Sequence, residues 1–157
     1  MNRIGLTASA LITLISAVSC SLPKEHGEFK PVDASGWLYN DTLSFAVATG
    51  DSVSTGDLAI AVRHSADYDY SNLWLEVTAP VNGVVRRDTV NLALADVYGR
   101  WLGKGLGLSY QRVDTIARGV TLSDSSHVSV RHIMRLDRLE GIEQLGVIFR
   151  PSGQGDN

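Results

Sequence analysis

A lysine set among glycines is the most suggestive chemical pattern in the chain, because Gly99 to Gly107 reads GRWLGKGLG. A phosphate-binding loop requires G-x-x-x-x-G-K-[ST], in which backbone N–H groups surround the phosphates and a hydroxyl reaches the metal. Here only three residues separate Gly99 from Gly103, and Gly105 stands where the hydroxyl residue is needed. We therefore expect no nucleotide binding by this loop, and the glycines need another explanation.

The histidines and acids are spaced poorly for catalysis or metal binding. The four histidines form no H-x-x-x-H pair and the chain has a single cysteine, so the sequence does not support a zinc site. His64 and His132 each lie on an apolar strand face, which favours core or edge positions over ligand roles. No G-x-S-x-G nucleophile motif and no obvious acid/base pair occur. We expect no catalytic residue, no metal and no cofactor.

One short acidic stretch, HSADYDYSNLW, places Asp67, Asp69, Ser71 and Asn72 within six residues. Alternating oxygens of this kind can bind calcium, but an EF-hand loop also needs a third acid, a glycine and a distal glutamate. The favoured interpretation is a loop between strands, in which Asp and Asn side chains bond to nearby backbone N–H groups.

Aromatic residues near this stretch and near the glycines suggest a docking surface. Tyr68 and Tyr70 would share one face of an extended, exposed loop, and such aromatics suit protein hot spots or sugar stacking. If residues 101–110 were extended, three alternate glycines would form a flat shelf that receives either a buried ring, such as that of Trp37, or a partner's side chain. We expect the two loops to lie near each other. The candidate partner-binding residues are Tyr68, Tyr70, Asn72, Trp101, Lys104 and Gly105.

From residue 37 onward, apolar residues alternate with polar ones and turn formers separate the runs. Asn82-Gly83, between two such runs, is the dipeptide that best fits a type I′ hairpin turn. About eight short strands without a helical period predict an all-β antiparallel sandwich, either jelly-roll or immunoglobulin-like. A short helix is possible within residues 136–144. The expected strands lie within 42–49, 57–64, 72–79, 84–95, 106–113, 114–122, 127–134 and 142–149.

The N-terminus predicts export. An uncharged, mostly apolar run follows Arg3 and is too short to span a bilayer comfortably, as is typical of a signal peptide. The run ends in SAVSC, which resembles the lipobox of bacterial lipoproteins and implies cleavage before Cys20, the only cysteine, and its lipidation with fatty acids such as palmitate. We expect a signal peptide over 1–19, a lipidated flexible tether over 20–36, a sandwich over 37–150 and a disordered tail over 151–157. With a net charge of −3 and no basic patch, nucleic acid is not an expected partner.

Four blocks in this order, DYDYSNLWLEV, DTVNLALAD, GRWLGKGLG and LEGIEQLGVIF, resemble the GldH family of gliding-motility lipoproteins. The resemblance covers about residues 37–149 and includes the preceding cysteine. It implies a membrane-anchored, non-enzymatic component that acts beside other envelope lipoproteins and the linked secretion machinery. Ser21 is not the acid that retains lipoproteins at the inner membrane, so the resemblance implies the outer membrane.

A second class of function remains open. A carbohydrate-binding envelope lipoprotein would use the same sandwich, with Tyr68, Tyr70, Trp74 and Trp101 as stacking platforms. An enzyme is least favoured, because no constellation of side chains supports one.

Overall fold

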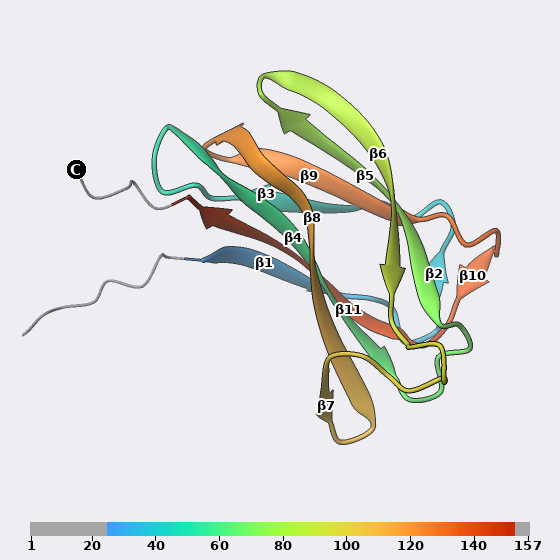
Figure 1. The fold of residues 1–157 in the computed structure, drawn as a ribbon. Coiled ribbons are helices and arrows are strands. Elements are labelled where there is room, and N and C mark those ends of the chain that lie inside the picture. The colour runs from blue at the N-terminus through green and yellow to red at the C-terminus, as the bar shows by residue number, and fades with distance from the viewer. Residues whose placement is uncertain (1–24, 153–157) are drawn as a thin grey trace, which may run out of the picture.

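The computed structural model describes residues 25–152, which form two antiparallel sheets packed face to face (Figure 1). The first sheet has the order β1-β11-β4-β8-β7 and the second the order β3-β9-β5-β6, while β10 and β2 pair separately. The all-β sandwich predicted from the alternating pattern is confirmed, and the described residues contain no helix. The strands are β1 His26–Pro31, β2 Trp37–Leu38, β3 Leu43–Val47, β4 Val53–Ser65, β5 Asn72–Val81, β6 Val84–Ala93, β7 Lys104–Leu106, β8 Ser109–Ser123, β9 Ser126–His132, β10 Arg138–Leu139 and β11 Ile142–Pro151.

The core forms where the alternating apolar residues of both sheets meet. Because successive side chains of a strand point to opposite faces, the odd-numbered apolar positions of β3 and β5 are buried together. The central strands β4 and β11 are buried along most of their length and form the middle of the first sheet. Fully buried members of this core include Phe45, Leu58, Ile60, Leu73, Leu75, Leu122, Val128, Leu145 and Phe149.

The predicted hairpin turn is confirmed. Val81 pairs with Val84, and Asn82 and Gly83 both have positive φ angles of 52° and 76°. Type I′ turns need positive φ at both central residues, which Asn and Gly tolerate best. This turn also joins the opposite sheet, because the Asn82 N–H donates to the Thr121 carbonyl at 3.0 Å and the Asn82 side chain accepts from the Thr121 N–H at 2.9 Å.

Two expectations about local structure are wrong. The segment expected to be tether contains β1, which pairs along its whole length with β11, from His26 with Phe149 to Pro31 with Gln144. A helix within 136–144 does not form, because β10 is followed by a turn at Gly141 (φ 84°) and then by β11. Residues 1–24, including Cys20, and residues 153–157 lie outside the described residues.

The strands define two ends of the sandwich. The N-terminal end holds the start of β1, the end of β11 and the turns at 48–52, 82–83 and 124–125. The distal end holds the loops 66–71, 94–103 and 107–108. β4 runs from one end to the other (Figure 1), and its 13 residues span roughly 40 Å.

Candidate functional site

Four aromatic rings pack together at the distal end and fix the loops there. The His64 ring centroid lies 4.6 Å from that of Trp101 and 5.8 Å from that of Tyr110, and the Tyr68 and Trp101 centroids are 6.5 Å apart. The two loops also share backbone hydrogen bonds, since the N–H groups of Leu94 and Ala95 both donate to the Ser71 carbonyl. The structure thus brings the two predicted loops side by side.

Tyr68 does not occupy the exposed position expected for it. Its side chain is only 3% exposed, and its hydroxyl donates to the Asn72 carbonyl at 3.0 Å. Burial raises the pKa of the Tyr68 hydroxyl, so the group remains neutral. Trp101 is half-buried against the core. Both residues hold the loops together from within. Tyr68 cannot serve as an exposed sugar-stacking platform, and Trp101 is partly covered by the same packing.

The glycine shelf does not exist, because the chain reverses within the stretch that was expected to be extended. β7 and β8 form a tight hairpin, with Gly107 at its turn at a φ of 66°. Gly103 also has a positive φ, and a Cβ added there would lie 2.2 Å from the Gln111 carbonyl oxygen. A Cβ on Gly105 would meet the Tyr110 ring at 3.4 Å. These glycines allow a turn and a close backbone approach.

The other predicted site residues face different surfaces. Lys104 is exposed on β7 at the distal end, beside the hairpin turn. Asn72 is half-buried, and its side-chain amide donates to the Asn91 side chain at 2.8 Å. Tyr70 faces the outer surface of the β3-β9-β5-β6 sheet, where it lines a shallow groove with Trp74 and Met134.

Two segments at the distal end, the turn at 96–99 and the β7–β8 hairpin, carry exposed apolar side chains. We call Val97, Tyr98, Leu106 and Leu108 the distal rim. Val97, Tyr98 and Leu108 are 93%, 81% and 83% exposed. Exposed apolar clusters of this kind mark interaction sites.

The loop that carries Val97 and Tyr98 is held in one shape by Asp96. The Asp96 carboxylate accepts bonds from the N–H groups of Tyr98 and Arg100 at 2.9 Å and from the Arg100 guanidinium at 2.7 Å. These bonds lower the pKa of Asp96 below its ordinary value. The Arg100 guanidinium also lies 5.5 Å from the centroid of the Tyr98 ring. The tyrosine is therefore exposed and preorganised.

Sequence reasoning missed the distal rim, although a signal was present. The segment Asp96 to Gly99 is a four-residue turn, closed by a bond from the Gly99 N–H to the Asp96 carbonyl at 3.0 Å. Asp at the first position and Gly at the fourth are typical of a type I turn. Reading that turn from the sequence would have placed Val97 and Tyr98 at its exposed centre.

The folded domain is expected to lose stability as the pH falls through about 6.5, the ordinary pKa of histidine. His64 and His132 are fully buried, and desolvation lowers the pKa of both imidazoles. Backbone hydrogen bonds oppose this effect at both residues. Glu143 also opposes it at His64, whereas Arg131 adds to it at His132. The unfolded chain therefore binds protons at a higher pH than the folded one, so stability is complete above about pH 6.5 and declines below it.

Thermal melting between pH 7.5 and pH 5.5 checks this. The melting temperature should fall by several degrees, and it should fall equally in His127→Gln, a control at an exposed position. A melting temperature that is constant over this range would contradict the account.

Within residues 25–152, no three His, Cys, Asp or Glu side chains gather closely enough to hold a metal ion. The described part of the chain also has no helix that is long and apolar enough to cross a membrane.

Comparison with known proteins gives a match to one protein family. Residues 25–148 match the model of a protein family described as GldH lipoprotein. A gliding motility lipoprotein GldH homolog of Christiangramia forsetii is 29% identical over 147 residues, which cover 87% of this chain and 89% of that protein. The gliding motility lipoprotein GldH of Flavobacterium johnsoniae is 24% identical over 152 residues, covering 92% and 95%.

Among solved structures, an exo-beta-1,3-galactanase from Phanerochaete chrysosporium is 14% identical, with a TM-score of 0.38. The match covers 80% of this chain and 27% of that one, and so slight a likeness carries no argument about ligands.

Proposed function

The chain belongs to the GldH lipoprotein family, and on this premise we propose that it is a membrane-anchored, non-enzymatic docking component of the gliding-motility and linked secretion machinery. The names of both relatives support the link to gliding. The observation that carries the docking role is the distal rim, where exposed apolar side chains stand on a preorganised loop.

The anchor in this proposal is Cys20, acylated after cleavage of the signal peptide, and the membrane is the outer membrane. Acyl chains stabilise such attachment by about 0.8 kcal/mol for each buried CH₂ group, so several chains hold the protein firmly. The sandwich then acts as a rigid spacer. It carries the distal rim roughly 40 Å from the end at which the chain joins the sheet.

The chemistry of the rim favours a protein partner. Tyrosine and arginine are over-represented among interface hot spots, and Tyr98 with Arg100 supplies such a pair. Because Asp96 already holds this loop, little conformational entropy is lost when a partner binds. The rim offers apolar contact with the cations Arg100 and Lys104 beside it, which suits a protein surface with an apolar pocket and a neighbouring acid.

A carbohydrate-binding role is the alternative, and the outer-face groove favours it. Tyr70 and Trp74 both line this groove and are both partly exposed, with Thr89 and Arg135 beside them. An exposed indole face can stack on a sugar ring, and the neighbouring polar groups can bond to hydroxyls. Of the four aromatic residues expected as stacking platforms, only Tyr70 and Trp74 line this groove.

Affinity capture from crosslinked, detergent-solubilised envelopes tests the docking role. We expect the tagged full-length protein to sediment with outer-membrane markers on a density gradient and to recover at least one other envelope protein. Sedimentation with inner-membrane markers would contradict the location. Recovery of the protein alone, together with binding to a glycan array that Trp74→Ala abolishes, would replace docking with the carbohydrate role.

A further inference from the structure

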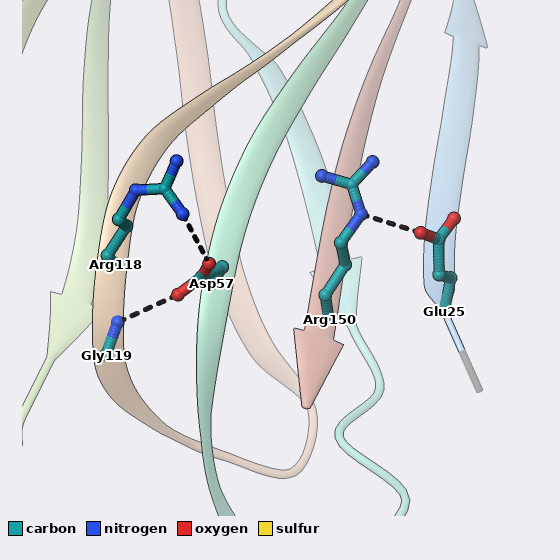
Figure 2. A network of polar contacts seen from close by, with 5 residues as sticks. All are labelled: Glu25, Asp57, Arg118, Gly119 and Arg150. Atoms are coloured by element: carbon teal, nitrogen blue, oxygen red, sulfur yellow. Dashed lines mark hydrogen bonds and ion pairs between the residues drawn. The ribbon is translucent and has the colours of Figure 1, made fainter. Parts of the chain in front are cut away.

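The chain joins the sandwich at a fixed place near its N-terminal end. Figure 2 shows Arg150 of β11 bound to Glu25, with its Nε 2.6 Å from the carboxylate, directly before β1 begins. On the other side of β11, Arg150 pairs in register with Asp57 of β4. Asp57 is held in turn by the Arg118 guanidinium at 3.2 Å and the Gly119 N–H at 3.0 Å. Glu25, the first described residue, therefore lies at the same position along the strand direction as Asp57.

The N-terminal end of the sandwich extends beyond this level by a short distance. β4 begins at Val53, four residues before Asp57, which corresponds to about 13 Å of strand. β1 runs from this end towards the distal end, so the chain approaches His26 from the N-terminal side. The turn at Gly50 lies close to this point, since a Cβ on Gly50 would be 3.4 Å from the His26 ring.

The length of the preceding chain limits how far the domain can stand from its anchor. Four residues lie between Cys20 and Glu25, and the five steps from one to the other reach at most about 17 Å. This reach barely exceeds the 13 Å by which the end of the sandwich extends. An acyl group on Cys20 therefore brings the N-terminal end of the domain against the lipid surface.

That end exposes apolar side chains. Val53, Val84 and Val85 are 58%, 61% and 71% exposed. They stand near one another, because Val53 pairs with Ser123 of β8, and the turn before Val84 is bonded to Thr121 on the same strand. Val53 begins β4, and Val84 and Val85 begin β6 beside the Asn82-Gly83 turn, so this end of the sandwich is apolar at its tip.

We propose that Val53, Val84 and Val85 insert into the lipid interface and fix the orientation of the domain on the membrane. This inference rests on the proposed lipidation of Cys20. This apolar contact alone is too small to bring an unanchored domain to the membrane. A short anchor, however, holds the valines beside the lipid at an effective concentration on the order of millimolar.

Charge does not drive this contact. Arg86 and Arg87 follow the valines, but Asp51 and Asp124 lie in turns at the same end and offset them. The contact is thus apolar and should be insensitive to salt. When the valines contact the lipid, the distal rim at the opposite end of the sandwich points away from the bilayer.

Brominated-lipid quenching tests the orientation. The acylated protein with Val85→Cys, carrying an environment-sensitive fluorophore, is reconstituted into phosphatidylcholine vesicles brominated near the headgroup end of the acyl chains. Val97→Cys, with the same fluorophore at the distal rim, is the matched control. The thioether at Cys20 leaves the introduced cysteine as the reactive thiol.

We expect several-fold stronger quenching at position 85 than at position 97, unchanged between 50 and 500 mM salt. Protein that floats with vesicles but is quenched equally at both positions would overturn the orientation while leaving the lipid anchor intact. Protein that does not float would overturn the anchor and this inference with it.

Discussion

Replacing Tyr98 and Leu108 together with alanine is expected to reduce partner recovery by at least tenfold while the domain stays folded. Both side chains are more than four-fifths exposed, so their removal leaves no cavity. Exposed positions of this kind usually change the free energy of unfolding by about 0.5 kcal/mol or less. Hot-spot side chains contribute about 2 kcal/mol or more to binding, which corresponds to roughly thirtyfold in affinity.

The matched control is Val84→Ala with Val85→Ala, which removes exposed apolar groups at the opposite end of the sandwich. In detergent extracts this control should recover the partner as well as the unaltered protein. Lys104→Ala, which removes an exposed cation beside the rim, should weaken recovery less than the double variant. Undiminished recovery by the Tyr98 and Leu108 double variant would show that the rim is not the docking surface.

A protein with Cys20→Ser is expected to incorporate no fatty acid and to be released from the membrane. Cys20 is the only cysteine in the chain, so no other thiol is available for acylation. The substitution should leave the fold intact, because β1 begins only at His26. Far-ultraviolet circular dichroism and melting temperature should match those of the unaltered domain.

Metabolic labelling with radioactive palmitate measures this effect. Ser21→Ala, which changes the adjacent residue and keeps the thiol, is the control and should label normally. Label that persists in Cys20→Ser would rule out the proposed anchor.

The strands of the core could be predicted from the sequence because burial on one face imposes a period of two. Phe45 and Val47 in β3, or Leu73, Leu75 and Val77 in β5, follow this pattern directly. β1 could not be predicted in this way. As an edge strand it buries little, and its pairing with β11 comes from backbone hydrogen bonds, which leave no hydrophobic pattern in the sequence.

The site was harder to predict, because exposure in loops depends on tertiary contacts. The proximity of Tyr68 and Trp101 was expected correctly. The burial of Tyr68, however, depends on packing against Trp101 and Gly141, which are both distant from it in sequence. The alternating glycines suggested a flat strand, whereas positive φ at Gly103 and Gly107 shapes a hairpin. Alternation alone cannot distinguish these two conformations.

The two ends of the domain have separate roles in this account. In the proposed arrangement the N-terminal end rests on the lipid surface, and Glu25 and Arg150 fix the start of β1 a short distance above it. The aromatic rings at the distal end hold the loops that carry Tyr98 and Leu108. A partner would therefore meet the protein on the side that faces away from its own anchor.

Site-specific photocrosslinking in intact cells tests the docking role most directly. A photoreactive amino acid is placed at Tyr98 in the distal rim and, in a second strain, at Tyr70 in the outer-face groove. We expect a crosslinked product with another envelope protein at position 98 and none at position 70. A product at position 70 with none at position 98 would contradict this expectation.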